Sequence, residues 1–340
     1  MMEERWLFGR RLDLGVFLGA ALLSLVALAI GHAAGVETTP DWAWVPAVLL
    51  VDVAHVWSTG FRVWFDPEEW RRHPVLYAAV PLLVLLGGIG LYARGGALLF
   101  WRVLAYLAVF HFVRQQVGWV VLYRARGGER DRWGAWLDSA TVYTSMLVPL
   151  LYWHTHLPRR FHWFLEGDFV ALPGALYAVA LPIYGVLLAV YTARALVSRP
   201  VNVGKHVVVS TTAVLWWVGM VTFDSDYAFT VTNVLMHGIP YIALVWVFQR
   251  HKARPLASNP VSYLGVLWAI AYVEELFWDR GVWHERSGLF GGAWDLEPWH
   301  VLLVPLLATP QVTHYVLDGI IWRRAANPEI AGMFGSVPRP

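Results

Sequence analysis

The chain has 340 residues, of which 58% are hydrophobic and only 15% are charged, and its formal net charge is +2. Soluble globular domains carry about 25% charged residues, so this composition excludes an ordinary soluble domain. The small net charge, without a run of basic residues, gives no indication of nucleic-acid binding. Cysteine is absent, which excludes disulfides, thiolate metal sites, iron–sulfur clusters and c-type haem attachment. Any metal must therefore be held by histidine, carboxylate or amide side chains.

Long apolar runs recur from one end of the chain to the other. They predict an all-α, polytopic integral membrane protein with about ten transmembrane helices. Residues 1–326 are expected to form a single transmembrane helical domain, and residues 327–340, which lack periodicity, a loose C-terminal tail. The predicted spans are 12–34, 42–64, 74–93, 97–123, 134–154, 171–196, 204–223, 227–248, 261–278 and 299–322.

The basic residues indicate how these helices are oriented. If the N-terminus is cytoplasmic, 19 of the 26 lysines and arginines fall in cytoplasmic segments and six fall in outer segments. Cytoplasmic loops of membrane proteins carry such an excess of positive charge. We therefore expect both termini to be cytoplasmic and the protein to lie in a bacterial cytoplasmic membrane.

Four of the thirteen histidines fall well inside predicted spans. The spans that carry them all run from the outside to the cytoplasm, and each histidine precedes the basic residue that closes its helix by 7 to 13 residues. At about 1.5 Å per residue, they lie at similar depth, roughly 10–20 Å from the cytoplasmic flank. Ionisable residues inside a membrane are costly and mark functional sites, so we expect the four to bind a metal together. They are His55, His111, His237 and His314.

Each of these histidines has polar residues on its own predicted helix face. A metal-binding histidine normally donates its second ring N–H to a carboxylate, an amide or a carbonyl group. We expect the neighbouring polar residues to orient the histidines or a bound water. Asp52 and Asp318 are placed either to ligate or to orient, and Tyr241 to donate a hydrogen bond or to act as a weak ligand. The full set is Asp52, Gln115, Asn233, Tyr241, Gln311 and Asp318.

The chemistry of this donor set narrows the function. Neutral imidazoles beside carboxylates and amides suit iron, zinc or copper. Three or four histidines with open coordination positions suit iron(II) and O₂, and a site among membrane helices favours a lipophilic substrate such as an isoprenoid or an acyl lipid. The leading interpretation is a membrane oxidoreductase, an oxygenase or oxidase with non-haem iron. Its partners would be membrane lipids, the substrate and O₂; no protein partner is evident.

Three alternatives use the same residues. A zinc-dependent intramembrane lipid hydrolase would use the metal to lower the pKa of a bound water, with an aspartate as base. A b-type haem would take two of the four histidines as axial ligands. A proton-coupled transporter, which is not an enzyme, would use intramembrane histidines and aspartates as a proton relay. The sequence does not separate these from the oxygenase.

Four short segments resemble the Brp/Blh family of membrane carotenoid cleavage oxygenases. They are Ala54-His55, His111-Phe112, the stretch His237–Trp246 with the form H-x-x-x-x-x-x-x-V-W, and His314 shortly before Asp318. The resemblance implies non-haem iron, O₂ and a lipophilic substrate of which a carotenoid is one example. Tyr241 stands where that family has a second histidine in the same helix. The resemblance therefore implies that His314 completes the site or that the geometry differs.

Overall fold

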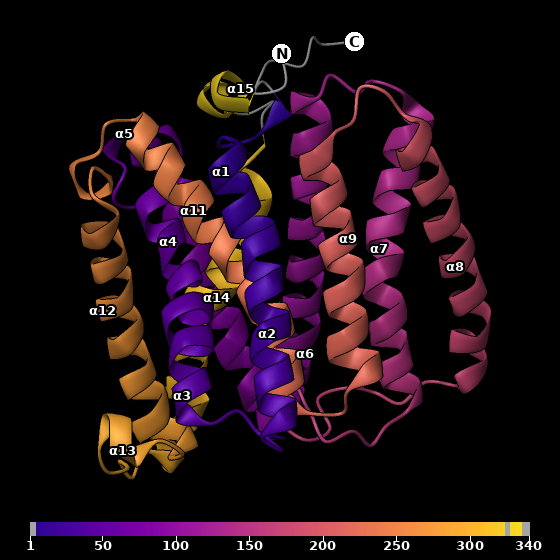
Figure 1. The fold of residues 1–340 in the computed structure, drawn as a ribbon. Coiled ribbons are helices and arrows are strands. Elements are labelled where there is room, and N and C mark those ends of the chain that lie inside the picture. Colours follow the sequence, from indigo (N-terminus) through magenta and orange to yellow (C-terminus); the bar gives the residue numbers. More distant parts are fainter. Residues whose placement is uncertain (1–4, 324–326, 335–340) are drawn as a thin grey trace.

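The computed structural model describes residues 5–323 and 327–334, and within these ranges the chain consists of helices and loops without a strand (Figure 1). The α-helices are α1 (Arg10–Asp13), α2 (Ala20–Ala33), α3 (Asp41–Trp44), α4 (Ala54–Arg62), α5 (Pro67–Arg72), α6 (Pro74–Arg126), α7 (Arg132–Thr155), α8 (Gly174–Val197), α9 (Val203–Trp217), α10 (Asp226–Phe229), α11 (Leu235–His251), α12 (Pro260–Trp278), α13 (Ser287–Phe290), α14 (His300–Ile321) and α15 (Pro328–Phe334). Five π-helical segments continue or join them: Leu14–Gly19, Val45–Val53, Val218–Thr222, Thr230–Val234 and Asp279–Trp283. Two 3₁₀ turns, Pro255–Ala257 and Glu297–Trp299, precede α12 and α14. The all-α prediction is confirmed for the described residues.

Seven helical stretches of the described chain are long and apolar enough to cross a membrane: Arg10–Ala33, Asp41–Arg62, Pro74–Arg126, Gly174–Val197, Asp226–His251, Pro260–Trp283 and Glu297–Ile321. The third holds two of the predicted spans, which join where Gly96 adopts a φ of 68° that breaks the helix. Helices also occupy the two remaining predicted segments, as α7 and as α9 with the π-helical turn after it. The number of spans and the orientation of the termini stay predictions.

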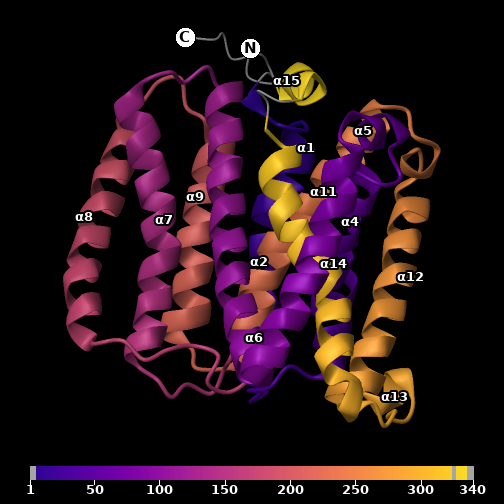
Figure 2. The ribbon, with the colours of Figure 1, turned by 180° about the vertical axis from the view of Figure 1, so that it is seen from behind.

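The helices stand side by side, with α12 at one edge of the molecule and α8 at the other (Figures 1 and 2). An inner group consists of α4, α11, α14 and the part of α6 after Gly96. Within it α4 contacts α11 and α14, and α6 contacts the same two helices. All four run in the same direction and end toward the side of the molecule where α15 lies (Figure 1). The four helices that carry the intramembrane histidines are therefore neighbours.

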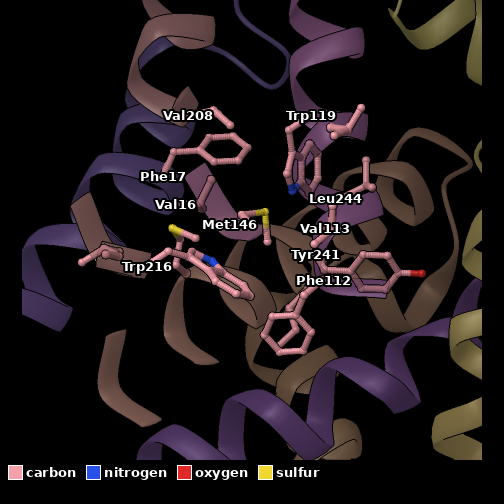
Figure 3. Close-up of a cluster of buried hydrophobic side chains, with 14 of the residues drawn as sticks. Val16, Phe17, Phe112, Val113, Trp119, Met146, Val208, Trp216, Tyr241 and Leu244 are labelled. Atoms are coloured by element: carbon pink, nitrogen blue, oxygen red, sulfur yellow. The ribbon is translucent and has the colours of Figure 1, made fainter. Parts of the chain in front are cut away.

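A buried aromatic and aliphatic core supports this inner group (Figure 3). Phe17 packs edge-on against Trp119, with ring centroids 5.2 Å apart, and Trp216 is completely buried beside Phe112. Large aromatic side chains each bury about 150–250 Å² and fix the spacing of the helices around them. Phe112 and Tyr241 lie at the edge of this core, so the rigid packing extends to the residues next to the histidines.

π-Helical turns precede two of the histidine-bearing helices. The segment Val45–Val53 leads into α4, Thr230–Val234 leads into α11, and the two segments contact each other. A π-helical turn holds more residues than an α-helical turn, so it rotates the side chains before it relative to those after it. Such turns occur frequently at functional sites. Asp52 belongs to the first of these turns and Asn233 to the second.

The predicted loose tail is wrong in its first part. Residues Pro328–Phe334 form α15, and the side chains of Ile330 and Phe334 are buried in the main core. Glu329 of this helix pairs with Arg72 of α5 at 3.0 Å. Packing, rather than intrinsic propensity, stabilises a helix this short, and a sequence pattern does not reveal it. Residues 335–340, the rest of the predicted tail, lie outside the described residues.

A charged cluster holds the same end of the bundle together. Asp66 caps α5 by accepting hydrogen bonds from the backbone amides of Glu68 and Glu69, at 3.2 and 3.4 Å. Its carboxylate also accepts from Lys252 and from Arg254, each at 2.6 Å. These contacts tie the turn between α4 and α5 to the end of α11.

Candidate metal centre

The four histidines of the inner helices converge on one point. Each offers a ring nitrogen, and these four atoms all lie within 4.8 Å of one another. The Nε2 atoms of His55 and His237 are 3.1 Å apart, and so are those of His111 and His314. All four side chains are at most 3% exposed. The structure thus forms a buried four-histidine group that could hold a metal ion.

The imidazoles are arranged as a closed ring around that point. Ring centroids of neighbours are 4.6 Å apart for His55 and His237, 4.9 Å for His237 and His111, 4.6 Å for His111 and His314, and 4.9 Å for His314 and His55. Neighbouring rings are steeply inclined, at 67–86°, whereas His55 and His111 face each other at 6.4 Å and 22°. This order follows the contacts of the helices, α4 with α11, α11 with α6, α6 with α14 and α14 with α4.

The donor set fits a single metal ion. Metal–nitrogen bonds of about 2.0–2.1 Å place two nitrogens of one ion roughly 3–4 Å apart. The four atoms here lie within 4.8 Å, so movements of a few tenths of an ångström would bring all of them into range. In the two Nε2 pairs only one atom of each pair can carry a proton, and a cation at the centre satisfies all four lone pairs. Imidazole ligands suit zinc, copper, iron and nickel, and the geometry does not choose among them.

A chain of hydrogen bonds reaches the cluster from behind His314. Thr59 Oγ1 lies 2.7 Å from His314 Nδ1 and 3.1 Å from the Tyr241 hydroxyl. The indole N–H of Trp322 donates to the Tyr241 oxygen at 3.2 Å. If His314 binds a metal through Nε2, its Nδ1–H donates to Thr59, whose own hydroxyl then donates to Tyr241. Tyr241 therefore stands behind the ligands, in the supporting position rather than the ligating one.

Thr59 is a residue that the sequence reasoning missed. It follows His55 by one helical turn on α4, so the helical period would have placed it on the same face. Threonine carries no charge and is common in membrane helices, which is why no polar signal drew attention to it. Its contact with α14 exists only in the folded bundle.

The two aspartates lie on the outer side of the imidazole ring. Asp52 Oδ1 is 3.5 Å from His55 Nδ1, and Asp318 Oδ2 is 3.8 Å from His111 Nδ1. Both carboxylates face Nδ1, whereas the cluster is built on the Nε2 side. The carboxylate of Asp318 on α14 therefore faces His111 on α6 rather than His314, which lies one turn earlier on its own helix. This placement favours orientation over ligation.

The arginines at the ends of these helices do not pair with the two aspartates. Arg62 forms a buried ion pair with Glu69 at 2.8 Å, and Arg323 donates to the backbone carbonyl of Gly319 at 2.7 Å. The carboxylates of Asp52 and Asp318 are thus left facing the histidines.

Two of the predicted amide residues bond to groups beside the imidazole rings rather than to the rings themselves. Gln115 Nε2 donates to the backbone carbonyl of His237 at 2.9 Å, which ties α6 to α11. Gln311 Nε2 donates to the hydroxyl of Tyr315 at 2.8 Å. Neither amide donates to an imidazole within the described chain, and the expectation that they orient the histidines or a bound water stays a prediction. Their contacts hold the backbone and an aromatic neighbour of the cluster instead.

The side chain of Asn233 bonds within its own helical stretch. Its side-chain amide donates to the carbonyl of Phe229 at 3.3 Å and to the hydroxyl of Thr232 at 3.0 Å. Both partners belong to its own helical stretch, where the π-helical turn alters the hydrogen-bond pattern. Asn233 thus completes the backbone bonding of that turn rather than orienting His237 by a hydrogen bond.

One aromatic ring stacks on each of two histidines. Phe112 stacks on His237 with centroids 3.7 Å apart and an interplanar angle of 9°. Tyr315 stacks on His111 at 4.5 Å and 22°. Each aromatic residue directly follows a cluster histidine in sequence, yet each stacks on a histidine of another helix. Tyr315 is a second residue that the sequence reasoning missed, because adjacency along a helix does not tell which neighbouring helix a ring meets.

Comparisons with protein-family models, with curated proteins and with solved structures found no match to this chain. The resemblance to the Brp/Blh family therefore rests on the short histidine segments alone.

Proposed function

We propose that the chain is a membrane oxygenase or oxidase that holds one non-haem iron ion in the four-histidine cluster and acts on a lipophilic substrate. The observation that carries this proposal is the convergence of four buried imidazoles, each from a different helix, on one point. Bound iron(II) supplies reactivity toward O₂. The protein supplies four neutral ligands, orients them through Thr59, Asp52 and Asp318, and excludes water with stacked aromatic rings.

Two features argue against the hydrolase and the haem. A hydrolase needs a general base aimed at a metal-bound water, but Asp52 and Asp318 face the outer Nδ1 side of the imidazoles. A haem needs a wide planar slot between its two axial ligands, whereas four imidazoles from four helices meet around one point here and occupy that space. Both features are compatible with a single small metal ion, and iron is the ion we propose because four imidazoles suit iron(II).

Metal analysis tests the proposal. Protein purified from iron-supplemented cells should contain close to one iron per chain, and the reduced protein should consume O₂ when mixed with an isoprenoid or acyl lipid substrate. Stoichiometric zinc without O₂ consumption would favour the hydrolase, and a Soret band would favour the haem. Absence of any metal from folded protein with all four histidines intact would contradict the metal centre. Solute uptake by proteoliposomes that persists without the histidines would point to a transporter.

We also propose that all ten predicted segments span a bacterial cytoplasmic membrane, with both termini in the cytoplasm. Helices at each segment, and the placement of α1 and α15 at one end of the molecule, support this topology (Figure 1). Because the chain has no cysteine, single cysteines can report it. A membrane-impermeant maleimide should label Glu166→Cys in intact cells and label Arg130→Cys only after lysis. Arg130 precedes α7 and Glu166 follows it, and both are exposed; labelling of both in intact cells would contradict the topology.

A further inference from the structure

An apolar groove of about 200 Å³ lies between the two halves of α6 and the first part of α14. Its twelve lining residues are all apolar. The floor is formed by buried side chains, among them Phe100, Leu104 and Ala308. With no charged or hydrogen-bonding side chain in its wall, the groove suits a hydrocarbon chain and offers nothing to a phosphate head group.

The mouth of the groove faces the bilayer. Leu83 is 66% exposed and Leu107 is 40% exposed, on a surface that carries many other exposed apolar side chains. In a membrane-spanning chain this surface contacts lipid rather than water. A hydrophobic molecule dissolved in the bilayer therefore reaches the groove without crossing a polar layer.

The inner end of the groove approaches the histidine cluster. Leu107 precedes His111 by one helical turn on α6, and Val312 precedes His314 by two residues on α14. At about 1.5 Å per residue, the groove ends roughly 3–6 Å along the helices from these two histidines. Tyr315 contacts both sites, because it stacks on His111 and packs against the buried cluster that holds Phe100, Leu104 and Ala308 of the groove floor.

Tyr315 and its partner Gln311 are the polar pair at this inner end. The Gln311 amide donates to the Tyr315 hydroxyl at 2.8 Å, and Gln311 lies directly beside Val312 of the groove wall. The pair therefore forms the boundary between apolar groove and metal centre.

Two adjacent glycines of α6 help to form the groove, each in a different way. A Cβ on Gly88 would lie 3.1 Å from Pro305 Cβ and 3.4 Å from Phe100, so Gly88 allows α6 and α14 to approach closely. A Cβ on Gly87 would meet no atom within 4 Å. Glycine inside a helix costs about 1 kcal/mol relative to alanine. Close packing accounts for Gly88, whereas the missing side chain of Gly87 leaves room in the groove.

We propose that this groove binds the hydrocarbon chain of the substrate and guides it from the bilayer past the Gln311–Tyr315 pair to the His111 and His314 side of the cluster. The occupant is an uncharged lipophile without a phosphate head group, because no lining residue can hold one. Identifying this occupant as the substrate rests on the proposed oxygenase function. The proposal that the groove binds a free lipophile depends only on its apolar lining and its exposed opening.

A photo-crosslinking experiment with matched variants tests the proposal. The full-length protein in phosphatidylcholine vesicles is irradiated with a diazirine-bearing analogue of geranylgeraniol, and labelled peptides are mapped by mass spectrometry. Labels should concentrate on the groove segments of α6 and α14. Gly87→Leu, which fills open space, should reduce this labelling at least about tenfold. The control is Gly185→Leu on α8, also an exposed helical glycine with no atom near its Cβ, which should label like wild type.

A milder variant and a lipid probe complete the test. Gly87→Ala adds a single methyl group to a helix that favours alanine, so it keeps the fold and should reduce labelling by a smaller factor. Equal labelling of the groove by a diazirine-bearing phosphatidylcholine would show that bilayer lipid occupies it and would overturn the proposal. Equal loss in both glycine-to-leucine variants would overturn it as well.

Iron content measured on the same samples separates this inference from the proposed function. Iron retained in Gly87→Leu together with lost labelling supports a groove that acts on the substrate and not on the metal. If wild-type protein from iron-supplemented cells contains no iron but its groove is still labelled, the proposed oxygenase function is contradicted and the groove remains a binding site for a lipophile. Iron-loaded protein without groove labelling would overturn the groove alone.

Discussion

The hydroxyl oxygen of Thr59 lies 2.7 Å from Nδ1 of His314, across the contact between α4 and α14. The bond fixes the imidazole plane and, with Nδ1 protonated, leaves Nε2 free to face the other histidines. One helix, α4, thus supplies both a cluster residue, His55, and the support for a histidine on another helix. The distance gives a direct prediction for each member of the pair.

Thr59→Val removes the hydroxyl at nearly constant volume and should weaken metal binding about 10–100-fold, as loss of a hydrogen-bond partner behind a ligand usually does. Competition with a chelator of known affinity measures the effect, and Thr59→Ser should restore binding. Thr141→Val is the matched control, since Thr141 is buried but bonds only to the carbonyl of Leu137 in its own helix. Unchanged metal affinity in Thr59→Val would contradict the supporting role.

His314→Ala should abolish stoichiometric metal binding while leaving the bundle folded. The substitution removes one of four converging nitrogens and opens the ring of imidazoles. Elemental analysis of the purified variant measures the outcome. His154→Ala is the control, because His154 is another buried histidine, bonded to Tyr106 and to the Leu150 carbonyl. Full occupancy in His314→Ala would assign this helix a supporting role and leave three histidines as ligands.

Gly88→Val should destabilise the protein by about 1–3 kcal/mol, because the added side chain meets Pro305 and Phe100 in a tight helix contact. Thermal unfolding in detergent measures the change as a lower midpoint. Gly90→Val carries the same helix-propensity change at a position with no atom within 4 Å and should unfold like wild type. Equal midpoints for the two variants would argue against close packing of α6 on α14 at this point.

Acid should weaken the Asp66 cluster at the end of the bundle. Burial by itself raises the pKa of Asp66, but the hydrogen bond and charge of Lys252 and the charge of Arg254 outweigh it and hold this pKa below the ordinary 3.8. Because the folded pKa is the lower one, the stabilisation is present above pH 3.8 and is lost as the pH falls through the folded value. Glu69 contributes in the same direction. Burial raises its pKa, but Arg62 and Tyr77 lower it by more, so the folded pKa lies below the ordinary value.

The unfolding midpoint of the wild type should therefore fall as the pH drops below about 4, and that of Asp66→Asn should fall less over the same range. Circular dichroism of the detergent-solubilised proteins follows both. Parallel acid sensitivity in wild type and variant would show that other carboxylates govern the response.

The sequence by itself determined the all-α class, the positions of the helices and the choice of the four histidines. These properties follow from local patterns, because apolar runs define helices and a buried ionisable residue stands out among apolar neighbours. The sequence also predicted that the four histidines form one site, because their distances from the basic residue that ends each helix place them at similar depth.

The tertiary structure alone decided which residues support the cluster and in what order the imidazoles meet. Thr59 supports His314, Asp318 faces His111, and Tyr315 stacks on His111; each contact joins helices far apart in sequence. Helical periodicity gives the face of a residue but not the helix that the face meets. Periodicity also does not reveal α15, which is stabilised because Ile330 and Phe334 are buried in the main core.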